Sequence, residues 1–176
     1  LSKRAGEIIG LDEIVDEVGS DVTRFIYLMQ SVDTRQTFDL VKAVEQSMEN
    51  PVYYVQYAHA RLHSILRKAA AAGVERGSLD DTDLSLLTHE SELGLLRVLS
   101  EFSDTVESAC NDRAPHRITT WVRELASAFH TFYRDCYVIG DVSPELTQAR
   151  LWLLEASRLG LLAGLDLLGV SAPEEM

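Results

Sequence analysis

Residues 50–73 read NPVYYVQYAHARLHSILRKAAAAG, and this stretch decides the fold class. Asn50 followed by Pro51 is typical of a helix start, because the asparagine side chain caps the first turn and proline lacks only an N–H that would be unpaired there. Gly73 is a suitable end for that helix. Between them apolar residues recur every three or four positions, which predicts one long amphipathic helix. Its expected buried positions are Val55, Ala58, Leu62, Ile65 and Ala69.

The same periodicity continues before this helix. Short helices are expected at residues 11–18 and 22–29, separated by Gly19, and a third across residues 40–48. Strand signals are nearly absent from the chain. The predicted fold is therefore all-α, a helical bundle.

Three more helices are expected after the long one. The first carries an apolar stripe from Leu95 through Phe102 to Val106, and the second a stripe from Ile118 to Phe132. Ser143 and Pro144 then repeat the helix-start pattern. The helix that follows is apolar on many sides and should be central in the bundle. Its leucines include Leu146, Leu151, Leu153, Leu154, Leu161, Leu162, Leu165 and Leu168.

Length and composition fit one folded domain. The chain has 176 residues, of which 46% are hydrophobic and 25% charged. Cys110 and Cys136 are the only cysteines, too few for a disulfide framework, and we interpret both as packing residues. No signal peptide is recognisable, and the most apolar stretch, residues 159–170, is interrupted by glycines and an aspartate. A soluble, cytoplasmic protein is expected.

The net charge of −12, from 16 basic and 28 acidic residues, argues against general affinity for nucleic acid. It does not exclude a local site, because charges farther away than a Debye length of about 8 Å are largely screened at physiological salt. An acidic body with a small basic and aromatic patch predicts selective, salt-sensitive binding.

Two helices each carry such a patch beside the buried stripe. Tyrosine rings can stack on nucleobases, and nearby cations can contact phosphates. The alternative is that the tyrosines border the core and the cations are ordinary solvated residues. The patch residues are Tyr54, Tyr57, Arg61, Ser64 and Lys68 on the first helix and Arg123, His130, Tyr133 and Tyr137 on the second.

Motifs for metal or catalytic chemistry are weak. His59 and His63 are four residues apart, but two nitrogen ligands are too few for a structural metal site. His89 and Glu90 resemble the start of a zinc-protease helix, which would need a histidine at Leu93. The residues alone favour a binding module over a self-sufficient enzyme, with no metal site.

The order of segments resembles the C-terminal part of arginyl-tRNA synthetases, class I enzymes whose helical anticodon-binding domain follows the catalytic domain. Four segments, distributed from the first residue to the last, carry the resemblance. They are LSKRAG (1–6), NPVYYVQYAHAR (50–61), ELASAFHTFY (124–133) and the C-terminal stretch from Ala149-Arg150-Leu151 to GVSAPEEM (169–176).

The resemblance implies a division of the chain into three parts. Residues 1–10 would end the catalytic domain's signature loop, residues 11–49 would form short linking helices, and residues 50–176 would form the anticodon-binding bundle. Ser2 and Lys3 would belong to the loop that steadies ATP phosphates. The parent enzyme would join arginine to its tRNA with ATP and magnesium. The chain alone is predicted to carry no cofactor and to be inactive.

The resemblance also implies that this part reads the middle anticodon cytosine of arginine tRNA. Composition alone would leave the tail of residues 171–176 disordered, but the family places a C-terminal methionine at the anticodon. The expected partners are arginine tRNA and the catalytic domain of the same chain, in a monomer. The predicted tRNA-binding residues are Tyr54, Tyr57, Tyr133, Tyr137 and Met176 by resemblance, with Arg61, Arg123 and Arg134 as phosphate contacts from helix-face geometry.

A competing hypothesis is a helical protein-interaction module without a nucleic-acid role. The two differ in the surface they require. RNA binding needs tyrosines half exposed beside arginines, whereas a groove for a partner helix would expose leucine or methionine anchors.

Overall fold

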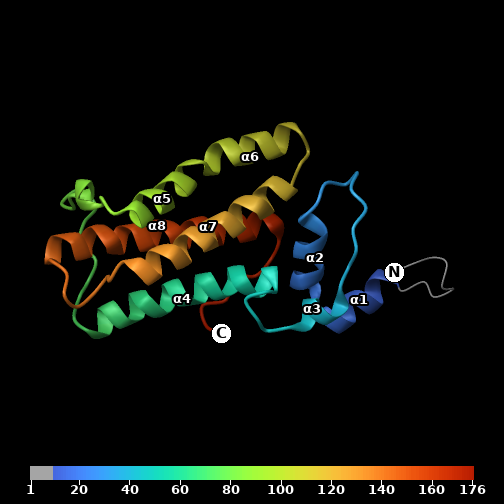
Figure 1. Cartoon of the computed structure of the whole chain (residues 1–176), viewed down its shortest axis with the longest axis horizontal. Coiled ribbons are helices and arrows are strands. Elements are labelled where there is room, and N and C mark those ends of the chain that lie inside the picture. The colour runs from blue at the N-terminus through green and yellow to red at the C-terminus, as the bar shows by residue number, and fades with distance from the viewer. Residues whose placement is uncertain (1–9) are drawn as a thin grey trace.

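The computed structural model describes residues 10–176 and is all-helical across them, which confirms the predicted fold class (Figure 1). Three short helices lie at one end of the molecule, and longer helices run side by side through the rest. The predicted ATP-loop residues Ser2 and Lys3 lie outside the described residues. The helices are α1 (Leu11–Val18), α2 (Ser20–Leu28), α3 (Leu40–Val44), α4 (Pro51–Ala71), α5 (Glu90–Ser100), α6 (Phe102–Asn111), α7 (His116–Asp135) and α8 (Pro144–Leu168), with a 3-10 turn at Leu84–Leu86.

Helix α4 begins where the sequence predicted, at a buried asparagine. The Asn50 side chain accepts hydrogen bonds from the backbone N–H groups of Val52 and Tyr53, at 3.0 and 3.4 Å. Its amide also donates to the carbonyls of Ala43 and Glu45, at 3.0 and 2.9 Å. One side chain therefore both caps α4 and fixes the turn that precedes it. The five positions predicted to be buried on α4 are buried.

Helix α8 is central, as its broad distribution of leucines predicted. It packs against α7, α4 and α5. Gly164 allows the closest approach, because a Cβ there would lie 2.4 Å from Cγ2 of Val122 on α7. Within residues 10–176, none of the helices has both the length and the apolar composition that crossing a bilayer requires.

The stripe from Leu95 to Val106 was predicted as one helix and is divided between α5 and α6. The Trp121 indole donates to the carbonyl of Val98 at 2.7 Å, and the Ser100 hydroxyl donates to that of Arg97, also at 2.7 Å. At the break the N–H of Glu101 bonds back only three residues, to Val98, at 3.3 Å. At the break, the backbone carbonyls of Arg97 and Val98 thus accept hydrogen bonds from side chains.

Two other expectations were wrong. Helix α3 ends at Val44, because Glu45 is extended and its carbonyl accepts the Asn50 amide; Met48 therefore lies outside it. Cys136 is buried, but Cys110 is exposed on α6, where its neighbour Ala109 faces the core instead.

Candidate nucleic-acid interface

Helices α4 and α7 and the C-terminal segment together border an open hollow of about 410 Å³, called the Tyr57 hollow below. It combines aromatic rings with three cations and two carboxylates. Four of the predicted tRNA-binding residues, Tyr57, Arg61, Tyr133 and Met176, line it. The remaining polar residues around it are Ser64, Arg67, Lys68, Glu174 and Glu175.

Arg61 lies between the two tyrosine rings of this hollow. Its Cζ is 4.5 Å from the ring centroid of Tyr57 on α4 and 4.7 Å from that of Tyr133 on α7. The guanidinium also donates a hydrogen bond to the Tyr57 hydroxyl. The two ring contacts hold the guanidinium in place, because a cation is attracted to the face of an aromatic ring. Tyr133 keeps 42% of its surface exposed, so the site remains open to solvent.

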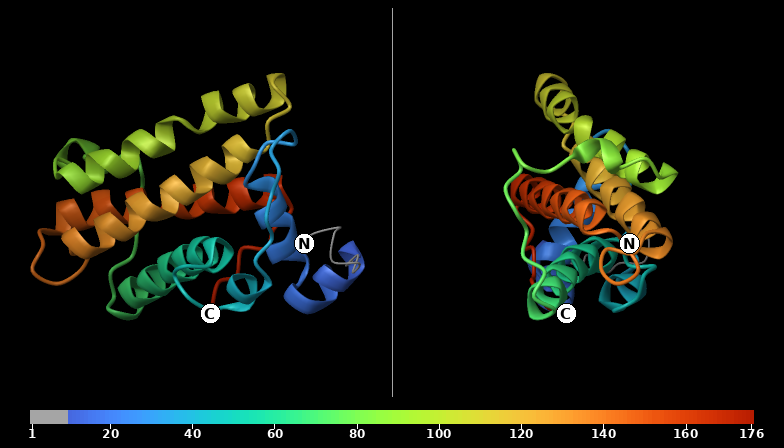
Figure 2. Two further views of the ribbon diagram at one scale, coloured as in Figure 1. Left: turned by 45° about the vertical axis from the view of Figure 1, so that its right-hand side comes forward. Right: turned by 90° about the vertical axis from the view of Figure 1, so that its left-hand side faces the viewer.

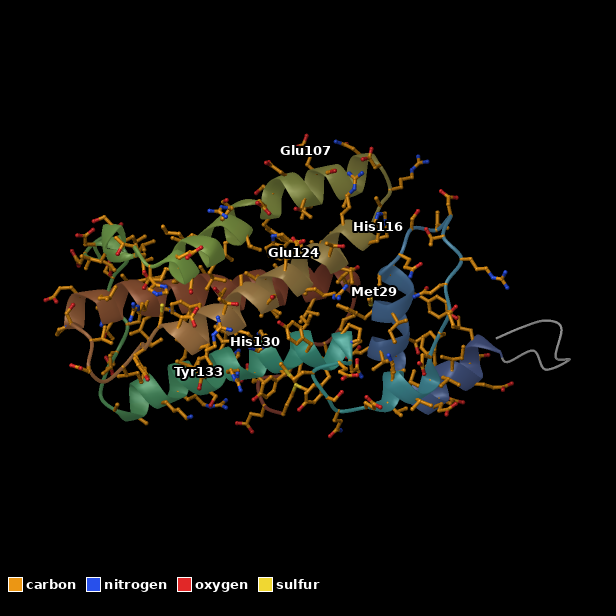
Figure 3. All side chains as sticks on the ribbon, viewed as in Figure 1. Met29, Glu107, His116, Glu124, His130 and Tyr133 are labelled. Atoms are coloured by element: carbon orange, nitrogen blue, oxygen red, sulfur yellow. The ribbon has the colours of Figure 1, made fainter. Side chains whose placement is uncertain are left out.

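His130 continues this row of rings along α7, and Figure 3 shows it one turn before Tyr133, on the part of α7 that lies along α4. Its ring centroid is 4.9 Å from that of Tyr54 and 6.1 Å from that of Tyr57. Burial, followed by the charge of Arg61, lowers the pKa of His130 to about 4. The imidazole is therefore neutral at pH 7 and adds no charge to the site.

Tyr54 and Arg123 border a second hollow of about 440 Å³, the Tyr54 hollow. Pro51 on α4 and Thr120 on α7 also line it. The rings of Tyr54 and His130 connect this hollow to the Tyr57 hollow. The structure thus distributes the predicted residues over two adjacent hollows in place of one.

Two of the predicted residues lie elsewhere. Tyr137 follows the end of α7 and is 78% exposed, but it lines neither hollow; its carbonyl accepts a hydrogen bond from Arg150. Arg134 forms an ion pair with Asp135 at 2.8 Å, and both border a different groove, between α5 and α7. Glu124 and Ser127 line both this groove and the Tyr54 hollow, so Arg134 lies beside the hollows and does not line them.

The C-terminal segment contributes a wall of the Tyr57 hollow that composition did not predict. Residues 171–176 follow α4 in place of extending into solvent, and Figure 2 shows them turning back from the end of α8. Arg67 on α4 forms an ion pair with Glu175 at 3.3 Å. Arg67 was not among the predicted site residues, although it lies four residues after His63 and therefore on the same side of α4.

His59 and His63, the pair considered as metal ligands, contact this segment. Their ring centroids are 4.7 Å apart. His59 is hydrogen-bonded to the carbonyl of Pro173, and His63 lies 3.8 Å from the Glu174 carboxylate. Within residues 10–176 there is no group of three or more side chains suited to hold a metal ion. Nδ1 of each histidine faces the C-terminal segment, and Nε2 of each is buried without a hydrogen-bond partner.

Comparison with known proteins matches residues 55–176 to the family described as the DALR anticodon-binding domain. Arginine–tRNA ligases are similar over the whole chain. Those of Carboxydothermus hydrogenoformans and Dehalococcoides mccartyi are 49% and 50% identical over 176 residues. The chain covers 31% of the length of each of these relatives.

Solved structures agree. A putative arginyl-tRNA synthetase from Campylobacter jejuni matches 98% of this chain, with 31% identity and a TM-score of 0.84. The chain covers 37% of that protein. The arginyl-tRNA synthetase of Thermus thermophilus matches 99% of this chain, with 30% identity and a TM-score of 0.73, and the chain covers 29% of it.

Proposed function

The chain belongs to the DALR anticodon-binding domain family, and from that premise we propose that the Tyr57 hollow binds an unstacked nucleotide of a tRNA anticodon loop. Tyr133 offers a half-exposed ring face on which a base can stack, while Arg61, Arg67 and Lys68 place positive charge beside it. The single observation that carries the proposal is the placement of Arg61 between rings from two helices.

The Tyr54 hollow is proposed as an adjoining contact surface for the same loop. Tyr54 provides a second ring and Arg123, which is exposed, a cation for a phosphate. The ring of His130 contacts Tyr54 and Tyr57 and is neutral, because its pKa is about 4. The two hollows are therefore joined by uncharged rings, and one RNA loop can contact both. We assign no place in either hollow to Tyr137 or Arg134.

The surface suits RNA better than it suits a partner helix. A groove for an amphipathic helix would present apolar anchors, whereas the Tyr57 hollow presents phenols, guanidiniums, an ammonium group and two carboxylates. Three apolar side chains, Ala60, Ile65 and Met176, also line the hollow, but Ala60 and Ile65 are buried and only Met176, at 55%, is well exposed. One exposed apolar side chain among these polar groups is compatible with contact to the face of a base.

The whole protein is proposed to be an arginine–tRNA ligase that uses ATP and magnesium. The support is the identity to ligases over the full length of this chain, of which the chain spans about a third. The residues that the resemblance assigns to ATP, Ser2 and Lys3, lie outside the described residues. The chain itself is proposed to supply binding of the anticodon arm and no reaction step.

The test is a titration of the chain with the anticodon stem-loop of an arginine tRNA. Tyr133→Ala should weaken binding about tenfold or more, since stacking on an aromatic side chain contributes roughly 1 to 3 kcal/mol per base. Tyr27→Ala is the matched control, because Tyr27 on α2 has a similar exposure, 45% against 42%, and lines a different pocket. Equal losses in both variants would refute the proposal.

A second set of ligands tests base reading. Stem-loops in which the middle anticodon cytosine is replaced by each other base should bind more weakly than the parent sequence. Equal affinity for all four would show that the hollow holds RNA without reading that base.

A further inference from the structure

Residues 170–176, called the strap below, return along α4 on the side away from Tyr54. Gly169 ends α8 in the left-handed conformation, with φ of 65°, and turns the chain back. Four side chains of α4, at spacings of three and four residues, then contact the strap, and together they form the strap edge. They are Gln56, His59, His63 and Arg67.

His59 is the best-buried contact on the strap edge, with 1% of its surface exposed. Its Nδ1 lies 2.9 Å from the Pro173 carbonyl oxygen and donates to it, since a carbonyl can only accept. Proline has no N–H of its own, so the carbonyl is the backbone group through which this residue can be held. The hydrogen bond from His59 is therefore the buried contact that holds the middle of the strap against α4.

The start of the strap is fastened from α2 as well as from α4. The Asp21 carboxylate accepts the backbone N–H of Ser171 at 3.1 Å, and Gln56 donates to the Ser171 carbonyl at 3.0 Å. Gln56 also donates to Asp21 at 3.3 Å, which closes the network. Arg24, one turn along α2, donates to the carbonyl of Gly169. Two helices thus determine where the strap begins.

The end of the strap reaches the Tyr57 hollow. Glu174 and Glu175 contact His63 and Arg67 with most of their own surface exposed, so these outer contacts are weak. Met176 then lines the hollow together with Tyr57 and Tyr133. The position of Met176 therefore depends chiefly on the buried fastening at His59 and on the network at Ser171.

We infer that His59, Gln56 and Asp21 are positioning residues for nucleotide binding, which act by holding the strap so that Met176 closes one side of the Tyr57 hollow. The inference rests on the proposed function of that hollow. It assigns a role in RNA binding to side chains that line neither hollow.

The experiment follows Met176 directly. The chain contains three methionines, so ¹³C-methyl methionine spectra are simple, and loss of a signal in Met176→Leu identifies the Met176 methyl group. The main variant, His59→Phe, keeps an aromatic ring of similar volume and removes the donor. His59→Asn restores an amide donor close to the position of Nδ1. His116→Phe at the start of α7 is the matched histidine control.

In His59→Phe the Met176 methyl signal should move to the shift of a free peptide with the sequence of residues 171–176. Affinity for the anticodon stem-loop should fall roughly fivefold, the equivalent of one lost hydrogen bond. His59→Asn should recover most of both effects, and His116→Phe should show neither. Far-UV circular dichroism checks that each variant remains helical.

Asp21→Ala on the surface of α2 is the second variant, and it keeps the test decisive if His59→Phe does not fold. It should displace Met176 in the same direction.

An unmoved Met176 signal in both variants, or a displaced signal with unchanged RNA affinity, would overturn the inference. If Tyr133→Ala also bound RNA as well as the parent chain, the proposed function itself would have failed. If Tyr133→Ala weakened binding and the strap variants did not, only the role of the strap would be refuted.

Discussion

Helix α4 has two polar edges that look alike in sequence and differ in the structure. The tyrosine edge, formed by Tyr54, Tyr57 and Arg61, faces α7 and borders the two hollows. The strap edge carries histidines, a glutamine and an arginine at the same three- and four-residue spacings, but residues 171–175 contact it. The spacing of rings and cations along a helix therefore does not show which edge borders an open hollow and which edge the rest of the chain covers.

The two arginines nearest the Tyr57 hollow show this difference in single residues. Arg61 stacks on Tyr57 and Tyr133, and within residues 10–176 it forms no ion pair with a carboxylate. Arg67, six residues later, pairs with Glu175. Ring faces leave the full positive charge of a guanidinium available to an anion, whereas a carboxylate neutralises part of it.

The largest expected effect is on RNA binding at the tyrosine edge. The double variant Tyr57→Ala, Tyr133→Ala removes the half-exposed ring of Tyr133 and both rings that hold Arg61, and it should lower affinity for the anticodon stem-loop roughly a hundredfold. Its melting temperature should change little, because neither ring belongs to the set of fully buried core side chains. Fluorescence anisotropy and thermal unfolding measure the two quantities. A loss of stability that matched the loss of binding would show that the tyrosines are core residues.

The strap edge should show the opposite pattern. His59→Ala empties a fully buried site and removes a hydrogen bond, so it should lower the free energy of unfolding by about 2 kcal/mol or more. Its effect on RNA affinity should be far smaller than that of the tyrosine double variant. Urea denaturation followed by circular dichroism gives the free energy. Unchanged stability would mean that the contact with Pro173 does not hold the strap.

The pH dependence of the unfolding free energy gives a further test on the tyrosine edge of α4, through His130. Its pKa in the folded chain is about 4, against 6.5 for an unperturbed histidine. As pH falls from about 6.5 to about 4, the unfolded chain takes up this proton first, and the folded state loses stability. His130→Phe should therefore lose less unfolding free energy than the parent chain between pH 7 and pH 4.

Other groups set the background for that measurement. Burial also lowers the pKa values of His59 and His63, so part of the slope remains in His130→Phe. Hydrogen bonding from Arg158 lowers the pKa of Glu155 to about 2. Its contribution is lost as pH falls from 4.5 towards 2, which overlaps the His130 range only between pH 4.5 and about 4. Parallel curves for parent and variant between pH 6.5 and 4 would contradict the assignment to His130.

The smallest expected effect separates the two arginines. Arg61→Gln should weaken stem-loop binding and reduce the slope of log affinity against log salt by about one unit, as for one lost phosphate contact. Arg67→Gln should reduce the slope less, because Glu175 already neutralises part of its charge. Titrations at several salt concentrations measure both slopes. Equal changes would show that the ion pair opens when RNA binds.

Local rules located much of the fold. The capping residues Asn50 and Ser143 begin α4 and α8, as predicted, because a helix start depends on the few residues around it. The break at Glu101 escaped prediction, since the indole that bonds to Val98 lies 23 residues away in sequence. No periodicity reports such a contact.

For the candidate site as well, only the features set by nearby residues could be predicted. Spacing placed Tyr54 and Tyr57 on one edge of α4, but not in separate hollows, since the second wall of each hollow comes from other elements. It grouped Arg134 with the site because a helix face has no boundary until its neighbours are known. The strap was missed because residues 171–176 are held by side chains far away in sequence.

The sequence by itself determined the all-α class, the starts of the long helices and which faces of them are apolar, because these follow from residues within a few turns of one another. Only the tertiary structure decided which polar edge of α4 remains available. That outcome depends on where α8 ends and turns back, and on the contacts that Asp21, Gln56 and His59 make with the returning chain.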